Sequence, residues 1–347
     1  MKWETSESYD LGLDLSMLKG SIDITADYFK KYTRDMILTN APDAHLGVSQ
    51  GPVSNVGTVQ NSGFEFSLTY KGKIDGLRYS ISGNLATIKN ELLDLNNYTS
   101  EYIYHENNVR GTLYPFRSEP GQELYSFYLI TCEGTFKSQS EIDAHVGPSG
   151  QLIQPNAKPG DLKFKDLNGD GVINNDDKSF KGNAFPDFTY GLNITANYKN
   201  FDSFHVFQGV SGAKLFNGYK YSTYNTALQG YNLDNRVLDA WSETNTGSDI
   251  PLLRVDDPNS NFGTNSDWYL EDASYLRMKN LTIGYNMPVS LMNKVSQGAS
   301  MRIYVSAENL FTITNYSGLD PEIGGIGLDI GNYPLARIFS AGLSLKF

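Results

Sequence analysis

The chain has 347 residues, with 28 Lys or Arg and 39 Asp or Glu, so its net charge is 28 − 39 = −11. This charge argues against a nucleic-acid binder, which needs a basic face to neutralise phosphates. The single cysteine, Cys132, excludes an internal disulfide framework. Because no uncharged apolar run reaches about 18 residues, a transmembrane helix is also excluded. Low charge (19%), abundant aromatic residues (13%) and a mean hydropathy of −0.39 together fit a β-barrel membrane protein.

Apolar and polar residues alternate in nine segments of the chain. These segments lie near residues 9–15, 22–28, 64–70, 77–85, 188–198, 204–209, 281–287, 303–307 and 339–347. A period of two over roughly ten residues is the signature of strands in a membrane barrel, whose two faces meet lipid and water.

The connections between these segments alternate in length. The short turns lie at 18–21, 71–76, 199–202 and 288–299. The long connections lie at about 37–60, 96–187, 211–270 and 315–335. Short periplasmic turns and long extracellular loops are typical of outer-membrane barrels. A further strand-like stretch, 122–136, is assigned to the interior of the 96–187 loop.

Nine strands do not close into an ordinary barrel. With an odd number, the first and last strands run in the same direction, whereas bacterial single-chain barrels have even numbers and antiparallel closure. We therefore expect residues 1–347 to be the C-terminal part of a larger barrel. No export leader is expected within the chain, because Met1-Lys2-Trp3-Glu4 does not open a basic region followed by an apolar one.

Residues 166–177 match the spacing of a twelve-residue calcium-binding loop. The ligand positions are occupied by Asp166, Asn168, Asp170, Val172 (through its carbonyl), Asn174 and Asp177. Gly171 falls at the sharp turn, and calcium prefers about six to eight oxygen ligands. The final ligand is Asp where a helix-loop-helix calcium site usually has Glu. The sequence predicts a structural calcium ion that pins a loop with little core of its own, and the alternative is a solvated Asn-Gly/Asp-Gly turn cluster.

Other residues do not form a recognisable catalytic or metal site. The four histidines are scattered rather than clustered as in zinc sites, at positions 45, 105, 145 and 205. No Gly-x-Ser-x-Gly elbow, phosphate loop or dinucleotide fingerprint occurs, so we expect no enzyme. Aromatic residues gather in 98–116 and 216–241. They either stack on sugar rings or peptides, or pack against one another or a partner.

Several strings carry a resemblance to a known family. They are WET at 3–5, NSGFE at 61–65, PGDLKFKD at 159–166, YLRMKNLTIGY at 275–285, AENLFT at 307–312, GLDPE at 318–322 and the terminal Phe347. In this order they resemble the SusC/RagA-type TonB-dependent outer-membrane transporters of Bacteroidetes, over essentially the whole chain.

The resemblance implies an all-β, antiparallel transmembrane barrel of 22 strands, of which this chain supplies about nine, with long extracellular loops. It implies import of oligosaccharides or peptides across the outer membrane, driven by TonB and assisted by a SusD-like surface lipoprotein. The plug and the TonB-contacting region of the family have no counterpart in this chain. The alternating residues of the last strand would be the signal read by the barrel-assembly machinery, namely Phe339, Ala341, Leu343, Leu345 and Phe347.

A second hypothesis is a soluble, all-β, calcium-binding module for adhesion or glycan binding. The calcium-type loop and the aromatic loops support it. The apolar strand faces argue against it, because they need lipid or a second sheet to cover them.

Overall fold

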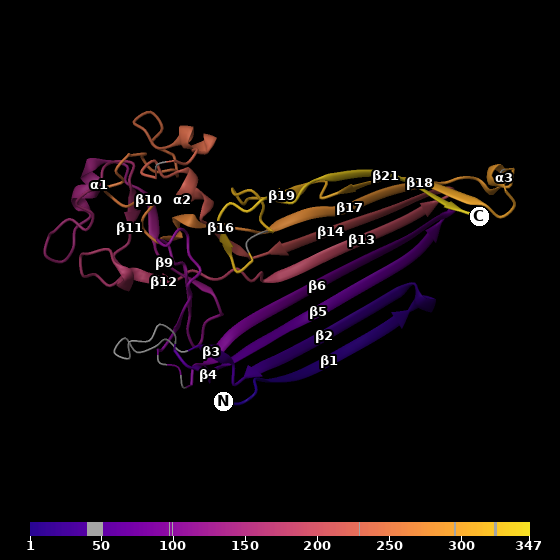
Figure 1. Cartoon of the computed structure of the whole chain (residues 1–347), viewed down its shortest axis with the longest axis horizontal. Helices are drawn as coiled ribbons and strands as arrows, with labels where there is room; N and C mark the ends of the chain where they lie inside the picture. Colours follow the sequence, from indigo (N-terminus) through magenta and orange to yellow (C-terminus); the bar gives the residue numbers. More distant parts are fainter. Residues whose placement is uncertain (40–50, 97, 99, 229, 295, 323–324) are drawn as a thin grey trace.

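The computed structural model describes residues 1–39, 51–96, 98, 100–228, 230–294, 296–322 and 325–347. Nine long strands form one antiparallel sheet in which spatial order follows chain order (Figure 1). They are β1 (Thr5–Met17), β2 (Ile22–Arg34), β5 (Thr58–Ile74), β6 (Leu77–Asp94), β13 (Phe188–Tyr198), β14 (Phe201–Ser211), β17 (Tyr275–Asn286), β18 (Ser300–Glu308) and β21 (Ile338–Lys346). The predicted nine strands are confirmed. A short strand, β19 (Thr312–Thr314), also pairs with β17.

Strand pairing sorts the side chains onto an apolar and a polar face. Directly paired residues of antiparallel strands share a face, and successive residues alternate. One row across β1, β2, β5 and β6 consists of Leu13, Ala26, Phe66 and Leu85. The neighbouring row consists of Asp14, Thr25, Ser67 and Asn84. The apolar face is exposed on strands from one edge of the sheet to the other, as at Leu13, Phe64, Val305 and Leu343.

Short turns join the strands at one end of the sheet. β1 and β2 are joined through η1 (Leu18–Gly20), and β17 and β18 through a segment that contains α3 (Val289–Met292). The predicted turn at 71–76 is too long, since β5 runs to Ile74 and only Asp75 and Gly76 connect it to β6. Both residues have positive φ, 46° and 86°, as a tight two-residue hairpin requires. No described helix is long and apolar enough to cross a membrane.

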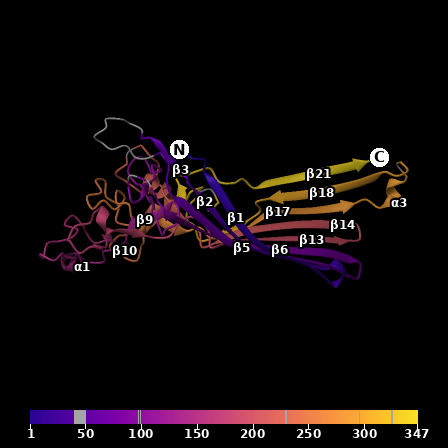
Figure 2. The same ribbon diagram turned by 90° about the horizontal axis from the view of Figure 1, so that it is seen from below.

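The long connections gather beyond the other end of the sheet (Figures 1 and 2). We call the β6–β13, β14–β17 and β18–β21 connections the loop layer. Its strands and helices are β7 (Ile103–Tyr104), β8 (Phe116–Ser118), β9 (Ser126–Ile130), β10 (Cys132–Thr135), α1 (Gln139–Ala144), β11 (Leu162–Phe164), η3 (Asn175–Asp177), β12 (Lys178–Phe180), β15 (Lys214–Asn217), α2 (Tyr219–Thr223), η4 (Asn235–Asp239), η5 (Asp267–Tyr269), β16 (Leu270–Asp272), β19 and β20 (Leu328–Asp329). A separate hairpin, β3 (Ile37–Thr39) with β4 (Val53–Asn55), lies between β2 and β5.

Figure 2 shows that the sheet is curved, with β1 and β21 as its two edges. The N-terminus lies at the loop end and the C-terminus at the turn end (Figure 1). The stretch 122–136 forms β9 and β10 inside the loop layer, so its assignment to a loop is confirmed. The three connections of the loop layer therefore leave the sheet at the same end. Of the fourth predicted long connection, 37–60, the hairpin β3–β4 also lies at this end (Figure 1), and residues 40–50 lie outside the described residues.

The loop layer has a hydrophobic core that no single loop contains. Phe116 and Phe127 from the first connection pack with Phe216 and Tyr269 from the second, and all four are at most 1% exposed. Burying each such ring contributes roughly 1.5–3 kcal/mol. Ile326 and Leu328 of the third connection pack against the same cluster, so three loops pool their apolar residues. That residues 166–177 pin their loop through a calcium ion stays a prediction.

Candidate functional site

The predicted calcium loop, 166–177, follows β11 and ends with η3, and hydrogen bonds to its own backbone order it. The Asp166 carboxylate accepts hydrogen bonds from the backbone N–H groups of Gly169 and Gly171, each at 2.7 Å. The fully buried Asp177 carboxylate accepts from the backbone N–H groups of Leu167 and Asn174, each at 2.8 Å. Because Gly171 has φ +87°, the sharp turn at this position favours glycine.

The remaining predicted ligands lie on the same loop. Asn168 accepts from the backbone N–H of Asp170 at 2.9 Å, and Asp170 accepts from that of Val172 at 2.9 Å. Asn174 caps η3 and forms a reciprocal capping pair with Asp177. Each carboxylate oxygen of Asp166 and Asp170 keeps a second lone pair beyond the bond it accepts, as does Asp177 Oδ2, whereas Asp177 Oδ1 accepts two hydrogen bonds. Among the described residues, no group of three or more His, Cys, Asp or Glu side chains converges to hold a metal ion, so calcium binding stays a prediction.

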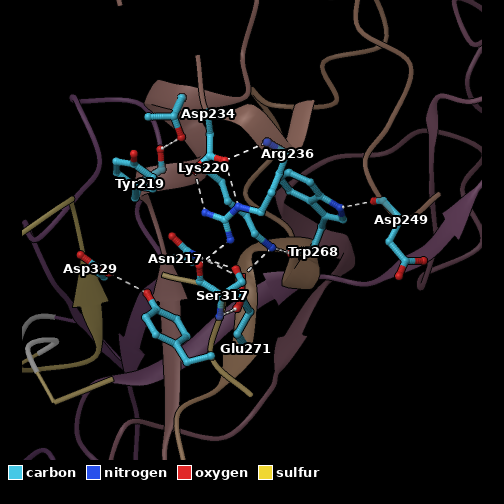
Figure 3. A network of polar contacts seen from close by, with 12 residues as sticks. Asn217, Tyr219, Lys220, Asp234, Arg236, Asp249, Trp268, Glu271, Ser317 and Asp329 are labelled. Atoms are coloured by element: carbon cyan, nitrogen blue, oxygen red, sulfur yellow. Dashed lines mark hydrogen bonds and ion pairs between the residues drawn. The ribbon is translucent and has the colours of Figure 1, made fainter. Parts of the chain in front are cut away.

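A polar network in the loop layer ties the second and third long connections together (Figure 3). Lys220 on α2 forms an ion pair with Glu271 on β16, with an Nζ–Oε1 distance of 2.7 Å. Ser317 from the third connection donates to the same carboxylate through both its N–H and its hydroxyl, each at 2.7 Å. Burial opposes ionisation of Glu271, but Lys220 and the Ser317 bonds outweigh it and hold the pKa below its usual value. The ammonium of Lys220 also lies 4.7 Å from the Trp268 ring.

A second charged cluster fastens the third connection to the barrel wall. The Arg277 guanidinium on β17 is 2.6 Å from Asp320 and 2.6 Å from Glu322. Lys279 adds a further pair to Glu322 at 2.6 Å. Sequence reasoning assigned these residues no role, although all four lie in the strings at 275–285 and 318–322. The sequence signal for this cluster was the presence of two cations, Arg277 and Lys279, in a segment that otherwise forms a barrel strand.

Of the pockets in the described part of the loop layer, one of about 430 Å³ lies beside Asp166 and Gly169, and three more are lined by residues of the first and second connections. The largest, about 810 Å³, lies at the junction of this layer with the sheet, where Lys181 pairs with Asp267 at 3.1 Å and Lys214 donates to the Lys181 carbonyl. Its charges largely satisfy one another. The other two, about 200 and 380 Å³, adjoin and share the residues Tyr104, Tyr114, Asn175 and Lys178.

The aromatic clusters predicted in the loops divide between packing and pockets. In 216–241, Phe216, Tyr221, Tyr224 and Trp241 are buried, so they pack within the loop layer. In 98–116, by contrast, rings line the two smaller pockets. Cys132 is half-buried, and burial raises the pKa of its thiol to about 12, which suits a packed thiol rather than a nucleophile.

The predicted assembly signal lies where the alternation placed it. Phe339, Ala341, Leu343 and Leu345 are paired with Ala307, Val305, Ile303 and Met301 of β18. Phe347 follows the end of β21 and is 83% exposed. The five residues therefore continue the apolar face to the edge of the sheet.

Comparisons with known proteins agree with this architecture. The family model described as "TonB dependent receptor-like, beta-barrel" matches residues 1–125. TonB-dependent receptor P3 of Formosa agariphila is 32% identical over 100% of this chain and 34% of its own length. TonB-dependent receptor SusC of Bacteroides thetaiotaomicron is 26% identical over 100% of the chain and 32% of its own length. The structure of the RagAB peptide transporter has the same fold, with a TM-score of 0.79 and 24% identity over 100% of this chain and 36% of that one.

The fold is thus that of a TonB-dependent receptor barrel wall. The chain belongs to the TonB-dependent receptor family, of the SusC/RagA type, and supplies part of its β-barrel. It spans about a third of the length of the curated relatives it matches.

Proposed function

We propose that this chain forms a wall and several extracellular loops of an active transporter in the outer membrane. The transporter imports oligosaccharides or peptides, is energised through TonB and works with a SusD-like surface lipoprotein. The observation that best supports this proposal is the nine-stranded sheet, which has one apolar and one polar face. All three connections of the loop layer lie at one end of this sheet. Lipid covers the apolar face, and the loops meet the substrate outside the cell.

The adhesion-module hypothesis is less well supported. A soluble sandwich buries its apolar strand faces against a second sheet. Here residues such as Leu13, Phe64 and Val305 are 54%, 43% and 55% exposed. The similarity to proteins named receptors and transporters, rather than enzymes, also supports the transport proposal.

Uptake by cells tests the proposal. The complete gene that contains this sequence is deleted and restored, and uptake of labelled oligosaccharides and of labelled peptides is measured. We expect deletion to abolish uptake of one class, a proton-motive-force uncoupler to do the same, and a surface lipoprotein to co-purify with the restored protein. Unchanged uptake of both classes in the deletion strain contradicts the proposal.

We also propose that the 166–177 loop binds a structural calcium ion. The ligand spacing and the free lone pairs of Asp166, Asp170 and Asp177 support this. Calorimetric titration of the complete protein should detect a calcium site, which Asp170→Ala weakens at least about tenfold, on the order of 1.4 kcal/mol. Asp170 is exposed and bonded only within its own loop, so the variant keeps the fold. If the wild-type protein gives no binding heat with calcium, the proposal fails and the loop is the solvated Asn-Gly/Asp-Gly turn cluster.

A further inference from the structure

The four-stranded sheet of the loop layer has two unlike faces. Its strand order is β12-β9-β8-β7. One face carries Phe116, Phe127 and Leu129, which are buried in the core. The opposite face carries Tyr104 from β7, Arg117 from β8, Tyr128 from β9, and both Lys178 and Phe180 from β12. The pairing of Tyr104 with Arg117 and of Lys178 with Ile130, two residues after Tyr128, sets these side chains on one side.

This face is the floor of an aromatic groove made by the two smaller pockets of the loop layer. Tyr104 and Tyr114 lie with ring centroids 5.8 Å apart. The Arg117 guanidinium lies 3.9 Å from the Tyr102 ring and 4.5 Å from the Tyr128 ring, and pairs with Glu119 at 2.5 Å. The tyrosine rings are therefore held in place by a fixed cation rather than by the core.

Polar groups line the groove without being satisfied within the described part of the chain. The Arg117 Nε and the Asn265 Oδ1 are buried and have no hydrogen-bond partner. The side chains of Asn175 and Asp176 are exposed and that of Lys178 is partly exposed, and none of the three makes a hydrogen bond or ion pair with other described residues. The two buried atoms lie out of reach of a ligand, whereas the exposed or partly exposed groups of Asn175, Asp176 and Lys178 pair with a ligand that supplies both donors and acceptors.

The 166–177 loop supplies part of the groove. Asn175 and Asp176 form the first residues of η3, which the capping pair of Asn174 and Asp177 holds in place. Lys178 follows directly on β12. The calcium-type loop therefore positions three polar side chains of the groove, whichever alternative explains its motif.

We propose that this groove is a binding subsite for a neutral saccharide. Hydroxyl groups both donate and accept, so a sugar in the groove pairs with Lys178 and Asp176, which line the smaller pocket together, while its C–H face covers the exposed ring of Tyr104. The net charge of −11 disfavours a polyanionic ligand. The groove lies on a sheet face rather than along an unpaired strand edge, so it lacks the backbone groups that capture an extended peptide. The inference rests on the proposed function, because it names the substrate class.

Binding measurements on the complete transporter in detergent test the subsite. The probes are short neutral oligosaccharides of glucose, mannose, galactose and xylose, and a mixture of short peptides. Tyr104→Ala removes a ring that is 55% exposed and outside the core, and Lys178→Met removes the amine but keeps the stem. The matched control is Tyr333→Ala, since Tyr333 is 89% exposed and lines neither pocket.

We expect at least one oligosaccharide to bind, with its affinity reduced about tenfold or more by Tyr104→Ala and by Lys178→Met and unchanged in Tyr333→Ala. Equal melting temperatures show that the variants fold. Binding of peptides alone, no binding of any probe sugar, or equal affinity in Tyr104→Ala overturns the subsite. Uptake by cells is scored separately. If the purified protein binds a sugar through Tyr104 but deletion of the gene leaves uptake unchanged, the transport proposal fails and the subsite stands.

Discussion

At the scale of single residues, Arg277 is the most deeply buried cation among the ion pairs of the described residues. It is 2% exposed and neutralises both Asp320 and Glu322 at 2.6 Å. Burial opposes ionisation of Asp320, but hydrogen bonding from Arg277 overrides it and keeps the pKa of this carboxyl below its usual value. Removing one partner of a buried pair typically costs about 3–5 kcal/mol, because the other charge stays buried and uncompensated.

We therefore expect Arg277→Met to release the β18–β21 connection, seen as faster amide hydrogen exchange and new protease cleavage at 315–322. Arg302→Met is the matched control. Arg302 also pairs with an aspartate, Asp202, at 2.5 Å, but its side chain is 32% exposed, so the loss is about 0–1 kcal/mol. Equal protection of 315–322 in both variants would refute the anchoring role of Arg277.

A pH dependence is expected at His105. Its ring stacks on Tyr125 at 3.9 Å, and its Nε2 lies 2.7 Å from the Ser118 hydroxyl, which itself accepts from the Tyr125 N–H. Burial lowers the pKa of His105 to about 4. An unfolded histidine titrates near about 6.5 and so binds the proton more readily than the folded state does. Stability is complete above this pH and falls as the pH drops from about 6.5 toward about 4, by on the order of 3 kcal/mol at most.

Nuclear magnetic resonance of labelled histidine measures this directly. The His105 ring signal of the folded protein should stay in the neutral form down to about pH 5. The variant His105→Gln should flatten the acid side of the stability profile of the loop layer. If the titration midpoint of His105 in the folded protein lies near the pKa of an unfolded histidine, the expected pH dependence is ruled out.

At the scale of elements, the backbone hydrogen bonds to Asp177 hold the segment from β11 to β12 together. Its carboxylate accepts the backbone N–H groups of Leu167, Asn168 and Asn174 while being fully buried. We expect Asp177→Ala to destabilise the segment by roughly 1–3 kcal/mol, because buried donors lose their partner. Protease cleavage within 165–178 should rise equally in calcium and in chelator. The control is Asp170→Ala, because Asp170 is exposed. In chelator, this variant should be cleaved at the same rate as the wild type.

How much of these elements the sequence reveals depends on the range of the forces involved. A barrel strand can be recognised from its own residues, because lipid and water impose a period of two on each strand. The boundaries of β13, Phe188–Tyr198, for example, match the expectation residue for residue. The turn at 71–76 was misplaced because Lys71 to Lys73 are polar yet stay paired to β6. The shared core of Phe116, Phe216 and Tyr269 joins residues about a hundred positions apart, and no local pattern encodes such contacts.

The candidate site divides in the same way. The motif of 166–177 was visible because its spacing is local, and so was the aromatic enrichment of 98–116. The groove was not, since it needs Tyr104, Tyr128 and Lys178 to meet on one sheet face. The anchoring of Asp320 by Arg277 likewise links residues 43 positions apart.

At the scale of the whole molecule, the two faces of the nine-stranded sheet make opposite demands on the same strand. Val305 lies on the apolar face, 55% exposed and paired with Ala341, while the next residue, Ser306, lies on the polar face and pairs with Ser340. A lysine facing lipid near the membrane midplane costs about 2–4 kcal/mol, and one facing the lumen costs little. We expect Val305→Lys to impair assembly of the complete protein in lipid vesicles, measured as loss of the heat-modifiable band, while Ser306→Lys assembles like the wild type. Equal assembly of the two variants would mean that lipid does not cover the apolar face, and the barrel-wall assignment would fail with it, since that assignment needs one face in lipid and the other in water.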